Sequence, residues 1–261
     1  MNIRDVHEAG PVTYRSRQLL DRGIWHAFTT RLGGVSAAPF DSLNFGAGDD
    51  PANLAENLRR LSASLHCENA TPARVRQVHG ARLRFVTAAN ACESADADAL
   101  ATDESGVLLM VRVADCVPVL LAEEVAEGRV RCVAAVHAGW RGLVGGVIPA
   151  AVAGLVDRFA AQPRRLIAAI GPCISAEHYE VGSEVAQAFT ACGLSDAVIR
   201  TGAKPHIDLR DAARRQLLQA GVPADRIDVS DRCTFRDTAE FFSHRRDASP
   251  GRMVAAIAMP A

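Results

Sequence analysis

Residues Val133–Gly142 read VAAVHAGWRG, a run of small and β-branched apolar residues that ends abruptly at His137. Apolar runs of this length predict a buried strand, and α/β proteins place their functional sites where such strands end. Two glycines then bracket Trp140 and Arg141, which indicates a turn after the strand. His137 is therefore the first candidate for a functional side chain.

Short apolar runs recur along the chain and alternate irregularly with helical patterns. The predicted strands cover residues 24–30, 74–79, 82–87, 107–113, 117–121, 129–137, 166–170, 227–229 and 252–259. Helices are expected at about 51–65, 145–161, 181–191 and 208–220, with Asp50 and Asp208 as N-caps. Because several neighbouring strands resemble hairpins, the pattern predicts an α/β (α+β) fold, a single layered domain with a mixed β-sheet flanked by helices.

Composition and charge exclude several classes of protein. The net charge of −1 offers no broad basic surface, so no nucleic-acid partner is expected. The polar, acidic start MNIRDVHEAG does not resemble a secretory signal, and charged residues or glycines interrupt every apolar stretch before it could cross a membrane. Seven cysteines without a CxxC pair argue against a disulfide framework or a zinc ribbon. A cytoplasmic location is therefore expected.

Two further residues share the setting of His137 at the end of a predicted strand. His79 closes the alternating run 74–79, and Cys116 lies between two intensely apolar runs. Two imidazoles and one thiolate are a good zinc-ligand set, which leaves a fourth position open for water or substrate. Zinc would lower the pKa of that water to about 7. Asp115 is a candidate for orienting a histidine, although a regular strand would point it away from Cys116.

The residues alone leave other interpretations open. Each histidine could be a hydrogen-bonded structural residue, and Cys116 a buried small side chain. Cys116 could equally be a nucleophile that His137 activates, which requires no metal. The spacing of the three residues matches no local metal-binding motif, and the common nucleotide-binding, protease and deaminase motifs are absent.

A series of short motifs nevertheless resembles the laccase-domain family. They are TRLGGVS (30–36), QVHG (77–80), DADAL (96–100), ADCVPVLL (114–121), HAGWRG (137–142), IGPCI (170–174) and CT…FFSHRR…GR (233–252). Members of this family were first called multicopper polyphenol oxidoreductases and are described as purine nucleoside phosphorylases with adenosine deaminase activity. The resemblance runs in order through nearly the whole chain, and ADC and HAGWRG together are highly specific.

This resemblance implies a zinc ion held by His79, Cys116 and His137. It also implies phosphorolysis of adenosine, inosine, guanosine and S-methyl-5′-thioadenosine, with hydrolytic deamination of adenosine as a second activity. Purine nucleosides and phosphate are the implied partners, and residues 1–261 are expected to form one such domain. The chain departs from the family where Leu58, rather than an arginine, follows Glu56-Asn57, so that Arg59 comes one residue late.

The two family names differ in the metal that they require. A multicopper oxidase needs several His-x-His pairs, and this sequence has eight histidines and no such pair. Copper remains the alternative ion, because it outcompetes zinc at most nitrogen and sulfur sites. A copper-dependent polyphenol oxidase, a metal-independent cysteine hydrolase acting on cell-wall precursors and a metal-binding partner protein are the alternative functions.

Phosphorolysis also requires cationic groups around the phosphate. Arg141 is the expected phosphate ligand because it follows a metal ligand by four residues, and Asp115 is the expected proton-transfer residue. The pair Arg245-Arg246 and the backbone amides of Gly33-Gly34 are further phosphate candidates. The sequence assigns no role to Cys173 and Cys233, and no oligomeric state.

Overall fold

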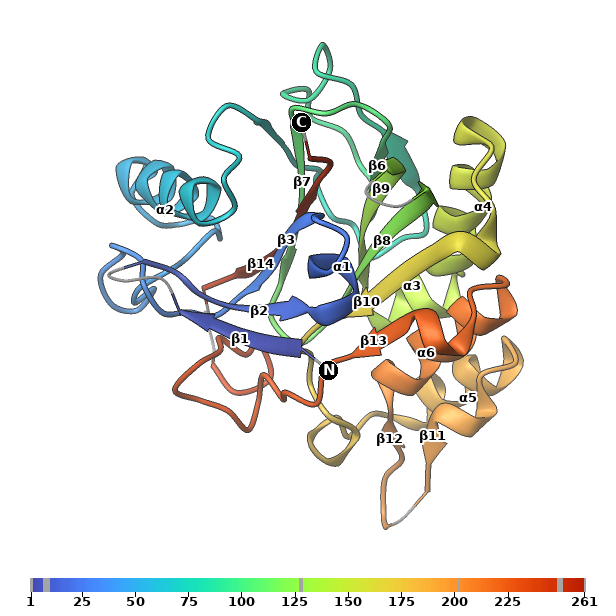
Figure 1. The fold of residues 1–261 in the computed structure, drawn as a ribbon. Helices are drawn as coiled ribbons and strands as arrows, with labels where there is room; N and C mark the ends of the chain where they lie inside the picture. Colours follow the sequence, from blue (N-terminus) through green and yellow to red (C-terminus); the bar gives the residue numbers. More distant parts are fainter. Residues whose placement is uncertain (1, 7–9, 127–128, 201, 248–250, 261) are drawn as a thin grey trace.

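Two mixed β-sheets form the centre of the computed structural model, which describes residues 2–6, 10–126, 129–200, 202–247 and 251–260. The first sheet has the strand order β1 (Asn2–Val6), β2 (Val12–Ser16), β3 (Trp25–Thr29), β14 (Met253–Ala258), β7 (Val107–Val113), β4 (Thr71–Ala73). The second has the order β13 (Ile227–Val229), β10 (Leu166–Ile170), β8 (Val117–Ala126), β9 (Arg129–Ala138), β6 (Ala99–Thr102), β5 (Leu83–Phe85). A small ribbon pairs β11 (Val198–Ile199) with β12 (His206–Ile207) (Figure 1).

The two large sheets pack face to face. Leu109 and Val111 of β7 lie in one fully buried cluster with Leu120 of β8 and Ala135 of β9. Alternate residues of the same strands point away from this cluster, as the two-residue period of a strand requires. Both faces of these strands are therefore buried, which explains why their sequences are continuously apolar.

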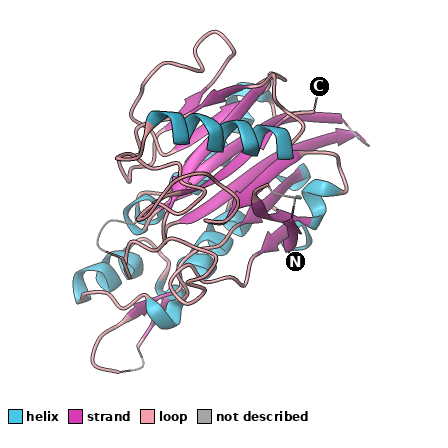
Figure 2. Ribbon diagram, turned by 90° about the vertical axis from the view of Figure 1, so that its left-hand side faces the viewer, coloured by secondary structure: helices cyan, strands magenta, loops and turns pink. Residues whose placement is uncertain are grey.

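Helices cover the two outer faces. They are α1 (Arg17–Leu20), α2 (Pro51–Ser64), α3 (Trp140–Val144), α4 (Val147–Phe159), α5 (Ser183–Ala191) and α6 (Leu209–Gln219), joined by the 3₁₀ turns η1 (Pro163–Arg165), η2 (Ala176–His178), η3 (Ser195–Ala197) and η4 (Ala224–Arg226). Helix α2 lies across the first sheet, where its Leu61 packs with Met110 and Val254 (Figure 2). The helices α3–α6 gather on the side of the second sheet (Figure 1).

The structure confirms the predicted mixed α/β class and most element positions. The caps Asp50 and Asp208 accept hydrogen bonds from the first backbone N–H groups of α2 and α6, as expected. The mixed sheet is, however, two sheets rather than one. A continuously apolar strand has both faces covered, but its sequence does not say whether a helix or a second sheet covers them.

Four local predictions were wrong. Residues 74–79 form a loop in which only Arg76 makes a bridge. The strand predicted over 82–87 was expected to form a hairpin with 74–79, whereas β5 pairs in parallel with β6. The helix predicted over 145–161 begins at Val147, because Gly146 has a φ of 76° and separates it from α3. The predicted turn after His137 is α3 itself.

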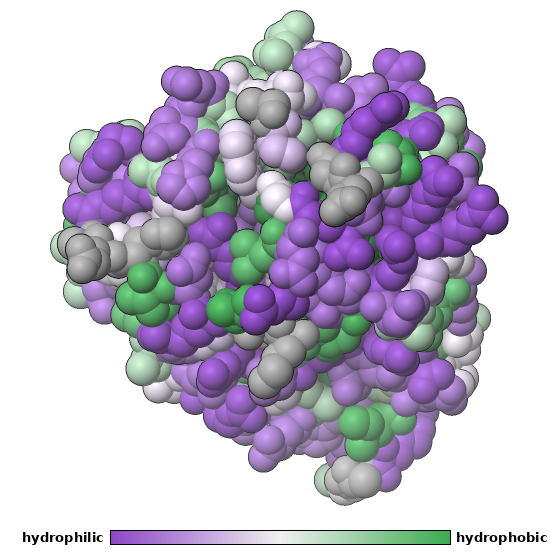
Figure 3. All heavy atoms as spheres, viewed as in Figure 1, coloured by the Kyte–Doolittle hydropathy of each residue, from purple (hydrophilic) through white to green (hydrophobic). Residues whose placement is uncertain are grey.

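The face of the molecule in Figure 3 carries mostly hydrophilic side chains, with apolar residues scattered among them. None of the described helices combines the length and the apolar composition that crossing a bilayer requires. Met1 and residues 7–9 of the N-terminal stretch lie outside the described residues.

The fully buried His26 of β3 links protein stability to pH. The backbone N–H of Ser16 donates to its Nε2, and its Nδ1 donates to the carbonyl of Ile24, both at 2.8 Å. Burial lowers the pKa of His26 from 6.5 to about 4, although the hydrogen bond to Ile24 opposes this effect. Between these two pH values the unfolded chain binds a proton that the folded chain excludes.

We expect the free energy of unfolding to fall by about 3 kcal/mol as the pH falls from about 6.5 to about 4. Urea unfolding at a series of pH values measures this loss. The variant His26→Gln, which cannot titrate, should lack this component. Equal pH dependence of the two proteins in this window would show that His26 does not control it.

Candidate metal centre

The register of the second sheet brings three chemically distinctive residues together. Pro118 of β8 is paired with His137 of β9, so Cys116 lies diagonally next to His137 on the same face. On the other side of β9, the backbone N–H of His137 donates to the carbonyl of Asp98 at 2.7 Å. Residues 98, 116 and 137 thus meet at the ends of three neighbouring strands.

His79 reaches this place from the loop that follows β4. The side chain of Gln77 pairs with the backbone of Arg112 in β7, accepting from its N–H and donating to its carbonyl, both at 2.8 Å. The side-chain amide of Gln77 thereby makes the two hydrogen bonds that the backbone of a neighbouring strand would make, and it holds the loop against β7. His79 has a φ of 58°, which turns the chain so that its imidazole faces Cys116.

The carboxylate of Asp98 fixes both histidines. It accepts hydrogen bonds from the backbone N–H groups of Val78, His79 and Gly80 at 3.2, 3.0 and 2.7 Å. It also accepts from Nδ1 of His137 at 2.8 Å, so that Nε2 of His137 is left as the metal-binding nitrogen. Asp98 is fully buried, and a single side chain therefore positions residues from two segments.

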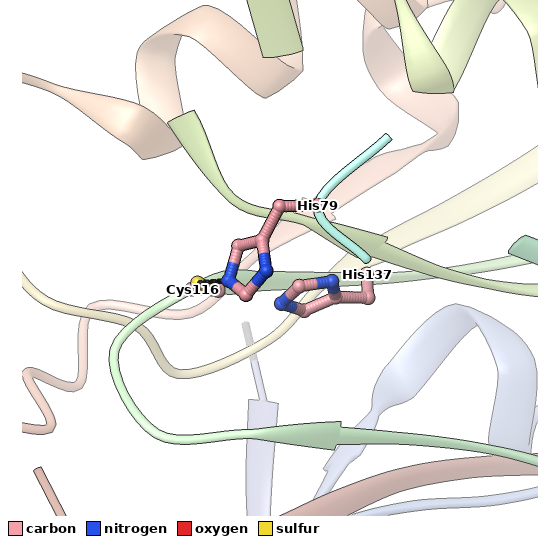
Figure 4. A group of neighbouring side chains, drawn as sticks. All are labelled: His79, Cys116 and His137. Carbon is pink, nitrogen blue, oxygen red and sulfur yellow. Dashed lines mark hydrogen bonds between the residues drawn. The ribbon is translucent and has the colours of Figure 1, made fainter. Parts of the chain in front are cut away.

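The potential ligand atoms of His79, Cys116 and His137 lie within 4.8 Å of one another (Figure 4). Sγ of Cys116 is 3.9 Å from Nε2 of His79, and the two imidazole rings meet edge to face at 4.9 Å. Gly139 lies beside them, where a Cβ atom would be 2.8 Å from Cδ2 of His79 and 3.2 Å from Sγ of Cys116. Only glycine leaves the side chains of His79 and Cys116 this space.

Cys116 and His137 stabilise each other's charged forms. Burial raises the pKa of the Cys116 thiol, but the charge of His137 and hydrogen bonds from both imidazoles outweigh it and bring the pKa down to about 6. Burial lowers the pKa of His137, but the Cys116 thiolate and Asp98 outweigh it and bring the pKa up to about 9. The surroundings of Cys116 thus favour its thiolate, the form that binds a metal.

The residues present fit a zinc ion. Zinc takes thiolate and imidazole ligands at about 2.0–2.3 Å, and three protein ligands leave a position open for substrate. The carboxylate–histidine pair of Asp98 and His137 is the usual outer support of such a site. Among the described residues, these three form the one cluster of at least three metal-ligating side chains.

Asp115 does not orient a ligating histidine, so this expectation is wrong. Its carboxylate accepts hydrogen bonds from Thr234 Oγ1 at 2.6 Å, from Ser243 Oγ at 3.1 Å and from the backbone N–H of Arg245 at 2.7 Å. It thus faces the C-terminal loop, while the neighbouring Cys116 faces the histidines. A φ of 88° at Asp115 makes the sharp turn between β7 and β8 that separates the two directions.

A cavity of about 470 Å³ opens in front of the three candidate ligands. Its lining consists of Gly46, Ala47, Gln77, His79, Arg112, Ala114, Cys116, His137, His244 and Arg252. This volume lies in the range of about 300–1,000 Å³ that is usual for small-molecule sites. The cluster of candidate ligands is therefore open to a small molecule on one side.

None of the arginines predicted to bind phosphate lines this cavity. Arg141 is exposed and its guanidinium stacks on its own neighbour Trp140 at 4.3 Å. Arg245 donates to the carbonyl of Glu180, and Arg246 donates to backbone carbonyls of its own loop, among them that of Phe241.

The remaining sequence candidates are not part of the cavity lining either. Gly34 donates its backbone N–H to Ser42 Oγ at 3.1 Å, and Gly33 packs against the backbone of Gly10. Arg59 is exposed and pairs with Glu56. Cys173 and Cys233 are buried free thiols.

Asp98, Arg112 and Arg252 are site residues that the sequence reasoning missed. One sequence feature could have drawn attention to Asp98, namely its place in an alternating acidic stretch that ends in a buried strand. Arg112 could have been noticed as the one charged residue of an otherwise apolar strand. Neither feature indicates which residues the side chain contacts, since those residues come from distant parts of the chain.

The family model described as multi-copper polyphenol oxidoreductase laccase matches residues 25–260. The chain belongs to this family. A purine nucleoside phosphorylase of Deinococcus radiodurans is 44% identical over 237 residues, which cover 90% of this chain and 89% of that protein. The purine nucleoside phosphorylase YfiH of Escherichia coli K12 is 39% identical over 240 residues, covering 90% and 94%.

Solved structures of similar proteins share the fold of this laccase-family chain. The crystal structure of YlmD from Geobacillus stearothermophilus superposes with a TM-score of 0.90 at 34% identity and covers 100% of both chains. The Bacillus licheniformis protein YfiH gives a TM-score of 0.88 at 27% identity, covering 98% of this chain and 99% of that one.

Proposed function

We propose that this protein is a zinc-dependent purine nucleoside phosphorylase of the cytoplasm, in which residues 1–261 act as one domain. It would convert adenosine, inosine, guanosine and S-methyl-5′-thioadenosine into the free base and ribose 1-phosphate. Hydrolytic deamination of adenosine would be its second activity. The observation that carries the proposal is the cluster of His79, Cys116 and His137 at the wall of a ligand-sized cavity. The names of the relatives support the substrate class.

Three of the site residues would bind the metal, and others would position those ligands. His79, Cys116 and His137 would hold the metal, which supplies Lewis acidity to an oxygen in its open position. Asp98 keeps Nε2 of His137 directed at the metal site, and Gln77 holds the loop that carries His79. Asp115 anchors the C-terminal loop behind Cys116, which makes it a positioning residue in this proposal.

Zinc is proposed rather than copper because the site offers one cluster of three ligands. Reduction of dioxygen to water by an oxidase takes four electrons, and a single three-ligand site does not store them. Metal analysis of the purified protein identifies the ion directly.

The deciding experiment incubates the metal-loaded protein with adenosine, with and without inorganic phosphate, and separates the products by chromatography. We expect adenine and ribose 1-phosphate only when phosphate is present, and inosine in both reactions. Absence of adenine, inosine and hypoxanthine from every reaction would refute the proposal.

The low pKa of the Cys116 thiol beside His137 favours one second candidate, a metal-independent cysteine hydrolase acting on amide bonds of cell-wall precursors. Exhaustive chelation separates the two. The hydrolase would keep its activity without metal and lose it in Cys116→Ser, whereas the phosphorylase would lose its activity on chelation.

A further inference from the structure

We infer that Arg112 and Arg252 form the anion subsite of the cavity and bind the inorganic phosphate that the reaction consumes. This inference rests on the proposed function for the identity of the anion. Its geometry is independent of that function, because both guanidinium-bearing residues line the cavity together with the three candidate metal ligands. The phosphate subsite therefore belongs to the first sheet, whereas two of the metal ligands belong to the second.

The strand register places the two arginines side by side. Val254 of β14 is paired with Arg112 of β7, and Arg252 lies two residues before Val254. Residues 112, 252 and 254 therefore point to the same face of the first sheet. Diagonal neighbours of this kind have Cα atoms about 7–8 Å apart, within reach for two long side chains that converge on one anion.

The side chains on this face change from apolar to charged along the strands. Its inner part is the apolar core under α2, to which Met110 and Val254 belong. Arg112 and Arg252 continue the same face beyond that core, and both are half-buried where they meet the cavity. A cation at these positions has apolar neighbours on one side and the cavity on the other.

The backbone at both arginines is held in place. The paired hydrogen bonds of Gln77 fix the backbone of Arg112, as described above. Oδ1 of Asn44 accepts from the backbone N–H groups of Arg252 at 2.8 Å and Gly46 at 2.7 Å. A Cβ atom at Gly46 would lie 3.0 Å from Cγ of Arg252, so the loop packs closely on this side chain. These contacts fix the backbone at both positions, and Nη1 of Arg252 donates to the carbonyl of Gly251 at 3.0 Å, which reduces the freedom that is lost when an anion binds.

Both cationic and anionic groups surround the pair. Burial lowers the pKa of Arg252 and the charge of Arg112 lowers it further, while Cys116 and Asp115 act in the opposite direction. Desolvation and then the charge of Arg112 lower the pKa of Arg74, whose side chain is exposed and does not line the cavity. Neither Arg74 nor Arg112 has a salt bridge to any carboxylate in the described part of the chain. A phosphate dianion between such cations relieves their mutual repulsion.

Guanidinium groups also match the geometry of phosphate, since they offer parallel N–H donors to two of its oxygens. In phosphorolysis, an oxygen of hydrogenphosphate bonds to C1′ of the ribose while the C1′–N9 bond breaks. The electron pair of that bond stays with the base, and the proton of hydrogenphosphate ends on the base nitrogen. The arginines hold the charge of the phosphate throughout, which keeps its oxygen in position.

Isothermal titration of the zinc-loaded protein with inorganic phosphate tests the inference without any turnover. Arg112→Gln and Arg252→Gln should each weaken phosphate binding by about 10-fold or more, because each removes a charge-assisted hydrogen-bond donor. Zinc content should stay at the wild-type level in both variants. Arg252→Lys should recover part of the affinity, since it keeps the charge and loses the planar fork. Arg129→Gln, at an exposed position of β9, is the matched control.

Wild-type phosphate affinity in both glutamine variants would overturn the inference, and loss of binding in Arg141→Gln alone would move the subsite to Arg141. The two proposals fail separately. If the arginine variants lose phosphate binding but the wild-type protein releases no base from nucleosides, the subsite stands and the phosphorylase proposal fails. If the wild-type protein is a phosphorylase and the variants bind phosphate normally, the subsite fails and the phosphorylase proposal stands.

Discussion

Replacing any one of the three candidate ligands should remove the metal and the activity together. In His79→Ala, Cys116→Ala and His137→Ala, zinc affinity should fall by more than about 100-fold, beyond the loss that follows removal of an outer-shell partner. The reason is that two remaining side chains do not enclose an ion whose preferred number of protein ligands in such sites is three. Metal analysis after gel filtration gives the zinc content of each variant, and base release from adenosine gives the activity.

The exposed thiol Cys92 provides the matched control for Cys116. Cys92→Ser should keep wild-type zinc content and activity, because this side chain is neither one of the three candidate ligands nor part of the cavity lining. Wild-type zinc content in all three ligand variants would disprove the metal centre. Loss of zinc with full activity would leave the metal centre in place and refute the proposed role of zinc in the reaction.

Asp98→Asn should produce the second large effect, a loss of zinc affinity of about 10–100-fold. The carboxylate of Asp98 accepts four hydrogen bonds, three from backbone N–H groups of the 78–80 segment and one from His137. Burial raises the pKa of Asp98, but His137 and the backbone donors outweigh it and lower the pKa, so the group is a carboxylate in the folded protein. An asparagine replaces one acceptor oxygen by a donor, which opposes the N–H groups it meets.

A competition titration with a coloured zinc chelator measures the affinity of Asp98→Asn, and urea unfolding measures its stability. The free energy of unfolding should fall by about 1–3 kcal/mol, because buried donors lose their acceptor. Asp96→Asn is a close control, since Asp96 lies two residues away in the same acidic stretch and pairs with Arg76 at the surface. Equal zinc affinity in the two variants would show that Asp98 does not support the metal centre.

Much of the candidate metal centre was predictable because metal binding depends on the types of residue that supply the ligands. A thiol or an imidazole at the end of an apolar run is unusual enough to be noticed in the sequence. His137 and Cys116 have this setting in the structure, whereas His79 was noticed at the end of a predicted strand that is in fact a loop. The structure brings the three together within 4.8 Å. The prediction for Asp115 was wrong for the same reason. A carboxylate is a suitable hydrogen-bond partner for a ligating histidine, but the φ of 88° at Asp115 turns its side chain away from the histidines.

The sequence by itself determined the α/β class, the N-caps of α2 and α6 and the identity of the three candidate ligands, because each depends on local pattern or on residue chemistry. Only the tertiary structure decided that Asp98 supports His137 and that Arg112 and Arg252 share the cavity. These relations depend on strand register and on the packing of two sheets. They join residues that are distant in the chain, and a local pattern carries no information about which distant strand lies beside it.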